Sequence, residues 1–94
     1  IKIALPTGYA GLIWDKSGLA GQGFTVLGGV IDAGYRGEIK VVFKNLSEDL
    51  YNIEAGQKIA QLLVQKIETP AIIEDKVDTD AARGDNGFGS TGLY

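Results

Sequence analysis

The sequence predicts an all-β sandwich or barrel. Short apolar stretches alternate with clusters of Gly, Pro, Asn and Asp at a spacing of roughly 8 to 12 residues, which is typical of that class. The clearest strand pattern is in residues 38–44, where Ile39, Val41 and Phe43 fall on one face and two lysines on the other. Because 94 residues bury only one modest core, a single domain is expected.

Strands and turns follow one another along this domain. In chain order the strands are expected at residues 1–5, 11–14, 24–27, 38–44, 50–53, 57–67 and 72–77. Between the third and fourth, residues 28–38 are interpreted as a hairpin whose tip carries Asp32 and Tyr35. From residue 78 the chain becomes polar and loses periodicity. The prediction is therefore a β core of residues 1–77 and a flexible C-terminal arm of residues 78–94.

Two segments have a helical component. Residues 57–67 are rich in helix formers, and Ile59, Leu62 and Ile67 share one helical face. They lack an N-cap and lie among strands, so a strand is the preferred interpretation. Residues 17–20 predict a single helical turn capped by Ser17, with backbone amides that would face an anion.

Composition excludes several function classes. With no Cys and no His, the chain has no disulfide, no thiolate metal site, no zinc-hydrolase centre and no His-based triad. The net charge is -3 and the lysines are scattered, so no nucleic-acid partner is expected. No stretch approaches a membrane span and no signal peptide is visible, so no membrane partner and a cytoplasmic location are expected.

The N-terminus predicts a longer protein. The chain contains no Met, and residues 1–5 begin in the middle of a strand pattern without a preceding turn. Ile1 is therefore expected to follow either a processing site or a further segment, and the strand pattern favours the segment.

The C-terminal residues 83–92 have the composition of a nucleotide-binding loop. Glycines let backbone N–H groups approach phosphate, Arg83 binds phosphate with two donors, and the ring of Phe88 stacks on a base. The alternative is a disordered C-terminus. The hairpin of residues 28–38 also has two interpretations. Its backbone can pair with a pyrimidine edge, or Asp32 is only a turn former and Tyr35 only packs.

Four motifs together resemble one family. Residues 30–38, 56–62 and 83–92 are similar to three of the five motifs of the trimeric deoxyuridine triphosphatase (dUTPase) family, in the family's order. Residues 17–20 resemble the end of a fourth motif. The similarity extends from Ile1 to Tyr94.

This resemblance implies a jelly-roll subunit in a homotrimer with shared active sites. The implied reaction is the hydrolysis of dUTP to dUMP and pyrophosphate with Mg²⁺. Asp32 would be the general base that activates the water attacking the α-phosphorus. Tyr35 would pack under the deoxyribose and exclude a 2′-hydroxyl.

The resemblance also assigns the substrate contacts. The uracil edge would be read by the backbone of Gly29, Val30, Ile31 and Lys40. The phosphates would be held by Lys16, Ser17, Gly18 and Gln61. A neighbouring subunit's arm would place Phe88 over the uracil, Arg83 on the γ-phosphate, and Gly89, Ser90 and Thr91 around the triphosphate.

The chain departs from the family pattern in three places. The first family motif, whose aspartate helps to place the magnesium, is absent, so no residue of this chain is assigned to a metal. Asp15 and Lys16 stand where the family usually has Pro-Arg; lysine loses the two-pronged grip on phosphate. Asp15 is expected either to weaken phosphate binding or to point at solvent or metal. Residues 26–29 offer no side-chain amide for uracil.

Two alternatives remain open. A dCTP deaminase or bifunctional relative shares the fold and a similar hairpin, although the motif of residues 83–92 argues against it. A nucleotide-binding or regulatory protein that has lost turnover is favoured by the missing first motif and by the Asp15 and Lys16 pair.

Overall fold

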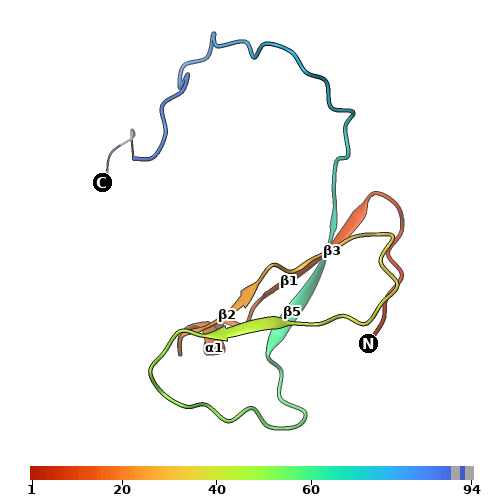
Figure 1. Ribbon diagram of the computed structural model, residues 1–94, viewed down its shortest axis with the longest axis vertical. Coiled ribbons are helices and arrows are strands. Elements are labelled where there is room, and N and C mark those ends of the chain that lie inside the picture. Colours follow the sequence, from red (N-terminus) through yellow and green to blue (C-terminus); the bar gives the residue numbers. More distant parts are fainter. Residues whose placement is uncertain (90–91, 93–94) are drawn as a thin grey trace.

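The computed structural model describes residues 1–89 and 92, and it is nearly all β (Figure 1). Its elements are β1 (Tyr9–Asp15), α1 (Ser17–Ala20), β2 (Phe24–Leu27), β3 (Val30–Ile31), β4 (Val42–Asn45) and β5 (Ala60–Lys66). They form a three-stranded sheet in the order β3-β1-β5 and a two-stranded sheet of β2 and β4. The predicted all-β class is confirmed, and so is the single short helical turn.

Strand β1 organises the larger sheet. It pairs antiparallel with β5 from Tyr9↔Lys66 to Asp15↔Ala60, and with β3 at Gly11↔Ile31 and Leu12↔Val30. The full-length pairing with β1 explains why residues 60–66 are a strand despite their helical periodicity, because tertiary contacts override local propensity. The preference for a strand in this segment is confirmed.

Strands β2 and β4 form the base of a wide hairpin. They pair from Phe24↔Asn45 to Leu27↔Val42, so residues 28–41 connect them. Within this connection, β3 pairs with β1 in the other sheet. Residues 38–41 therefore have no strand of the hairpin beside them. The strand predicted for residues 38–44 therefore begins only at Val42. Its inward face is confirmed, because Ile39 and Val41 pack against the core cluster while Lys40 is exposed.

Three predicted strands are wrong. Residues 1–5, 50–53 and 72–77, all of which the structure describes, carry no strand. An apolar alternation makes one face of a strand, but a strand also needs a hydrogen-bonding partner. Leu50 and Ile72 are almost fully exposed in this chain, at 103% and 96%. Strand β1 also begins earlier than predicted, at Tyr9, because β5 pairs with it as far as Lys66.

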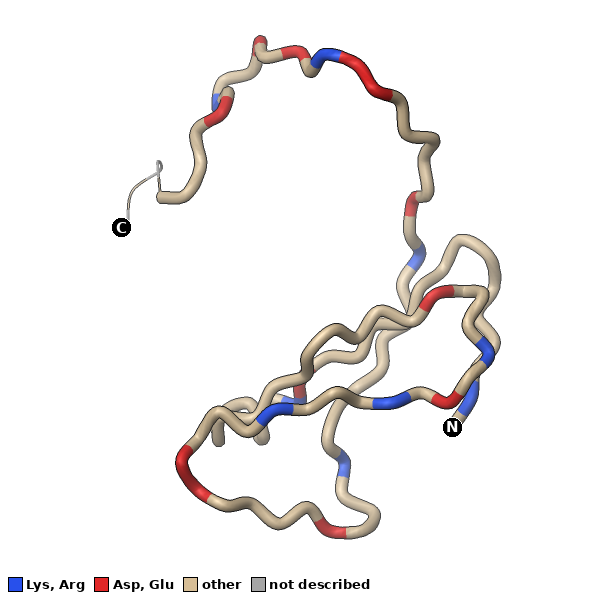
Figure 2. Tube along the Cα trace, viewed as in Figure 1, with Lys and Arg blue, Asp and Glu red and all other residues tan. Residues whose placement is uncertain are grey.

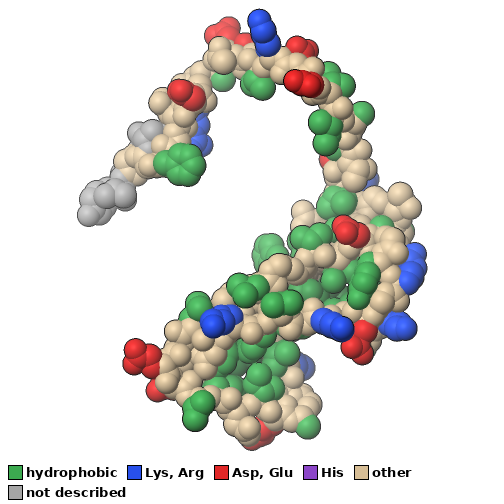
Figure 3. Space-filling view, in the orientation of Figure 1, with side chains coloured by type: hydrophobic (Ala, Val, Ile, Leu, Met, Phe, Trp, Pro, Cys, Tyr) green, Lys and Arg blue, Asp and Glu red, His purple; other side chains and the backbone are tan. Residues whose placement is uncertain are grey.

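The core is small. Leu5, Ile13 and Ile31 form its central cluster. A second contact lies at the other end of β2, where Phe24 stacks on Phe43 with ring centroids 5.3 Å apart and meets Tyr51 edge-on at 4.8 Å. Many large apolar side chains remain exposed across the body (Figure 3), including Trp14, Val42 and Leu46.

After β5 the chain leaves the body and runs outward in a wide arc (Figure 1). Among the described residues, the last backbone hydrogen bond between this segment and the body joins the Ile67 N–H to the Gly8 carbonyl at 2.9 Å. The radius of gyration is 18.7 Å, against roughly 12 Å for a compact chain of this length. Acidic and basic residues are interspersed along the body, whereas the charged residues of the arc after Ile67 are mostly acidic (Figure 2). The only helix among the described residues, α1, has four residues, whereas crossing a membrane takes about 20.

Candidate active site

Five of the predicted site residues meet in one hollow of about 210 Å³. Strand β3 contributes Val30 and Ile31, the turn after it contributes Asp32 and Tyr35, and the returning chain contributes Lys40. Glu38 completes the lining. The side chain of Asp32 is exposed, so solvent reaches its carboxylate. The hollow therefore combines an apolar wall, a tyrosine ring, two carboxylates and an ammonium group. We call this cavity the Asp32 hollow.

The turn that carries Asp32 is fastened by its own hydrogen bonds. The Tyr35 N–H donates to the Asp32 carbonyl at 3.1 Å, and the Tyr35 hydroxyl donates to the Glu38 carbonyl at 2.6 Å. The Arg36 guanidinium donates to the carbonyls of Ala33 and Tyr35. These contacts hold the tyrosine ring at the wall of the hollow.

Gly37 makes room for that ring. A Cβ at Gly37 would lie 2.5 Å from the Tyr35 hydroxyl oxygen and 2.6 Å from Cζ. Any side chain there displaces the ring, because real Cβ contacts are not this short. Sequence reasoning assigned no site role to Gly37 or Glu38. The signal that could have found Gly37 is a glycine two positions after an aromatic residue within a turn.

Gly29 lets β3 approach β1. Its φ is +106°, and a Cβ would lie 2.7 Å from the Ile13 carbonyl oxygen. At this close approach the Ile13 N–H donates to the Gly29 carbonyl at 2.8 Å. Gly29 was predicted to read a base with its backbone. Its carbonyl is bonded to β1 and Gly29 is not among the lining residues, so reading of a base by the rest of its backbone stays a prediction.

Replacing Gly29 with Ala should therefore destabilise the protein and distort the hollow. The left-handed φ and the Cβ clash are expected to lower the free energy of unfolding by about 1–3 kcal/mol. Gly34→Ala is the matched control: nothing lies within 4 Å of its Cβ position, so a change within about 0.5 kcal/mol is expected. Denaturant unfolding measures both. Equal losses would contradict the close approach of β3 to β1.

The predicted phosphate residues lie at the opposite end of β1. Lys16 is the N-cap of α1, in an extended conformation, and no side chain caps the helix. Ser17 is the first helical residue, so its predicted role as cap is wrong. The carbonyls of Lys16 and Ser17 accept the amides of Ala20 and Gly21 at 2.8 and 2.9 Å. The amides of Ser17 and Gly18, in the first turn, have no acceptor within the helix.

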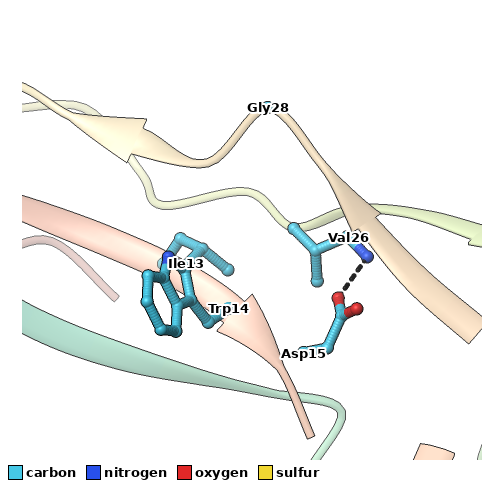
Figure 4. A pocket seen from close by; sticks show the side chains of 5 residues that line it. All are labelled: Ile13, Trp14, Asp15, Val26 and Gly28. Atoms are coloured by element: carbon cyan, nitrogen blue, oxygen red, sulfur yellow. Dashed lines mark hydrogen bonds between the residues drawn. The ribbon is translucent and has the colours of Figure 1, made fainter. Parts of the chain in front are cut away.

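The Asp15 carboxylate is hydrogen-bonded within the protein (Figure 4). Its carboxylate accepts the Val26 N–H at 2.6 Å and the Thr25 hydroxyl at 3.0 Å, both from β2. The expectation that it points at solvent or metal is wrong, because two strand donors bind it. Gln61, on β5, donates its side-chain amide to the Asp15 carbonyl at 2.7 Å. An amide NH₂ carries two hydrogens, so this bond leaves a second one for a phosphate.

Within this single chain the structure does not bring all predicted residues together. Lys16, Ser17, Gly18 and Gln61 do not line the Asp32 hollow. The arm lies apart as well (Figure 1): Phe88 is fully exposed, and the Arg83 Nε donates only to the Asn86 carbonyl at 2.7 Å. Gly89 is also exposed, whereas Ser90 and Thr91 lie outside the described residues. The arm's described backbone bonds beyond Ile67 are all local, for example Gly84 N–H to the Ala81 carbonyl at 3.1 Å.

A magnesium site made by the chain alone is not formed by the described residues. No three His, Cys, Asp or Glu side chains among them come together as ligands. Mg²⁺ is commonly held by one or two carboxylates together with substrate phosphates. The described donors therefore fit an ion that arrives with a triphosphate better than one held in a protein cage.

Comparison with known proteins connects this geometry to one family. The dUTPase family model matches residues 1–92. A deoxyuridine 5′-triphosphate nucleotidohydrolase of Thermobifida fusca is 49% identical over 96 residues, covering 98% of this chain and 54% of the relative. Curated relatives of this chain are longer, and the chain spans between 54% and 67% of the length of three of them.

Solved structures agree with the sequence relatives. A dUTPase mutant of Staphylococcus bacteriophage 80alpha with dUpNHpp matches with a TM-score of 0.85 and 28% identity, over 98% of this chain and 72% of that one. A dUTPase mutant from phage phi11 of S. aureus, described with a structural Mg(II) ion, matches with a TM-score of 0.69 and 26% identity, over 82% of this chain and 68% of that one. These likenesses confirm the jelly-roll class. On the family model and the sequence identities together, the chain belongs to the dUTPase family.

Proposed function

We propose that the protein hydrolyses dUTP to dUMP and pyrophosphate. The observation that carries this proposal is the Asp32 hollow, in which Val30, Ile31, Tyr35 and Lys40 surround an exposed carboxylate. All of these residues except Lys40 belong to the motif of residues 30–38, which resembles the family. Family membership and the dUTP analogue in the phage relative support the same substrate. A cytoplasmic location remains part of the proposal.

Asp32 acts as the general base. Its carboxylate accepts a proton from a water molecule as the water oxygen forms a bond to the α-phosphorus. The bond from the α-phosphorus to its bridging oxygen breaks, pyrophosphate leaves, and the proton passes from Asp32 to solvent. A positioned base of this kind contributes about 10²–10⁴ in rate. Exposure of Asp32 supports the role, because the water must reach the carboxylate.

The hollow selects a deoxyribonucleoside. Tyr35 packs under the deoxyribose, where its ring is held by the Glu38 carbonyl and by Gly37. A ring fixed at this position leaves no room for a 2′-hydroxyl. The backbone of Val30 and Ile31, with that of Lys40, reads the uracil edge as an added strand would. Gly29 contributes indirectly, by fixing the position of β3 against β1.

The phosphates are held by a second group of residues. Lys16 supplies a positive charge, the amides of Ser17 and Gly18 donate from the first turn of α1, and Gln61 donates its remaining amide hydrogen. When Mg²⁺ arrives with the triphosphate, it would neutralise part of the phosphate charge. No residue of this chain is proposed as its ligand.

The complete site is shared between subunits of a homotrimer. The two groups of residues lie apart in one chain, and the arm extends away from both (Figure 1). Large apolar side chains exposed on the body support an assembly that covers them. In this arrangement Arg83 reaches the γ-phosphate, Phe88 covers the uracil, and Gly89, Ser90 and Thr91 surround the triphosphate of a neighbouring site.

Pyrophosphate release tests the proposal directly. With Mg²⁺ present, the protein is expected to convert dUTP to dUMP and pyrophosphate, and to act far more slowly on UTP and dTTP. Release of ammonia from dCTP would instead identify the deaminase alternative. Tight binding of dUTP without pyrophosphate release would identify the non-catalytic alternative. Absence of both binding and turnover would contradict every nucleotide-based reading of the Asp32 hollow.

A further inference from the structure

Asp15 departs from the usual family pattern, and the proposed reaction gives it no role. We propose that Asp15 is a positioning residue that holds the phosphate segment, residues 16–18, in place for the triphosphate. The inference rests on the proposed function, because the proposed function assigns these residues to phosphate.

The carboxylate joins two sheets. Asp15 is the last residue of β1, in the three-stranded sheet, whereas both of its donors are on β2 in the other sheet. The distances are 2.6 Å from the Val26 N–H to Oδ1 and 3.0 Å from the Thr25 hydroxyl to Oδ2. Hydrogen bonds to an ionised acceptor are roughly twice as strong as neutral ones. The residue immediately before the phosphate segment is thereby fixed to β2.

The backbone of the same residue is fixed from the other side. The Gln61 side chain, on β5, donates to the Asp15 carbonyl at 2.7 Å, although the two residues are 46 positions apart. Asp15 is therefore held by its side chain to β2 and by its carbonyl to β5. This double attachment sets the direction in which Lys16 begins α1, and it fixes the amide of Gln61 as well.

The hydrogen bonds to the Asp15 carboxylate also explain how its negative charge is tolerated next to the proposed triphosphate site. Both carboxylate oxygens of Asp15 accept hydrogen bonds from β2, and neither donor belongs to the phosphate segment. Removing the carboxylate leaves the half-buried Val26 N–H without this acceptor, and such a donor is costly to leave unpaired. An asparagine keeps the geometry: its oxygen accepts from Val26 and its NH₂ donates to the Thr25 hydroxyl. Comparing alanine with asparagine therefore separates position from charge.

The test measures two affinities in the intact protein with Mg²⁺. Calorimetry with a non-hydrolysable dUTP analogue and with dUMP is carried out on wild type, Asp15→Ala and Asp15→Asn. Asp15→Ala is expected to weaken analogue binding by about ten- to a hundredfold and dUMP binding by less than about threefold. With dUTP as substrate, its KM is expected to rise more than its kcat falls. Asp15→Asn is expected to bind the analogue at least as tightly as wild type.

Two further measurements separate positioning from general stability. Amide hydrogen exchange at Val26 is expected to accelerate in Asp15→Ala and to remain slow in Asp15→Asn. Glu48→Ala, which removes a carboxylate from the exposed loop after β4, is the control, and neither affinity is expected to change. If Asp15→Ala does not fold, Thr25→Val carries the test. It removes one donor with little change of shape, and about a threefold loss confined to the analogue is expected.

Equal losses for the analogue and dUMP, or no loss in either, would overturn the inference. So would failure of Asp15→Asn to restore analogue binding. A wild-type protein that binds the analogue but releases no pyrophosphate from dUTP would contradict the proposed function and leave the comparison of Asp15 variants valid. A wild type that binds neither nucleotide would overturn both.

Discussion

Asp32→Asn should reduce the turnover of dUTP by about 10²–10⁴-fold while nucleotide binding stays close to that of wild type. The amide has the same shape as the carboxylate but cannot accept a proton from water. Asp32 lines the hollow from a turn whose bonds involve its backbone carbonyl, not its side chain. The substitution therefore leaves the turn intact. Steady-state kinetics and calorimetry with dUpNHpp measure the two effects separately.

A second carboxylate in the Asp32 hollow provides the comparison. Glu38 fastens the turn through its backbone carbonyl, so Glu38→Gln leaves the bond from the Tyr35 hydroxyl intact. Its effect on turnover is expected to be at least tenfold smaller than that of Asp32→Asn. An active Asp32→Asn variant would refute the general-base role. Similar losses in both variants would indicate that the charge of the hollow, not one base, supports turnover.

Deleting residues 83–94 should leave a folded protein whose turnover falls by about a hundredfold or more. The fold should survive because Phe88 is fully exposed and the described hydrogen bonds of this segment are local. Turnover should fall because Arg83 and the glycine-rich backbone no longer reach the triphosphate. Thermal unfolding and pyrophosphate release measure the two properties. Asp80→Asn, also in the arm but outside the motif, is expected to change turnover by less than about threefold.

Mixing two inactive variants tests whose site the arm serves. Subunits with Asp32→Asn keep an intact arm, and subunits lacking residues 83–94 keep an intact base. If the arm acts on a neighbour, refolding the two together creates some sites with both parts, and activity returns. If each arm serves its own subunit, the mixture stays as inactive as its components. Full activity of the truncated protein by itself would show that the arm is not required.

The resemblance of one segment to the family indicated most of the residues that line the Asp32 hollow. Val30, Ile31, Asp32 and Tyr35 are consecutive or nearly so, and a turn brings such residues together whatever the remainder of the fold does. Lys40 joins them because the chain returns after the turn. All of these residues except Lys40 belong to the motif of residues 30–38. The role of Gly37 was not predicted, because it depends on where the Tyr35 ring lies.

Features that depend on strand pairing were less predictable. The contact from Asp15 to β2 depends on how one sheet meets the other, which periodicity does not encode. Residues 72–77 were predicted as a strand, but they have no partner within the described chain. In contrast, residues 60–66 have a helical pattern and become a strand because β1 pairs with them along their whole length. In each case the outcome was decided by a distant segment.

The turn around Tyr35 has a consequence for the order of events during folding. Three of its fastening contacts, from Tyr35 to Asp32, from Tyr35 to Glu38 and from Arg36 to Ala33, each span three residues. Loops this short close within about 100 ns. The bond from Gln61 to Asp15 must instead wait for residues 46 positions apart to meet. The turn that carries Asp32 and Tyr35 is thus built from contacts that can form early, whereas the attachment of Asp15 to β5 needs one that forms late.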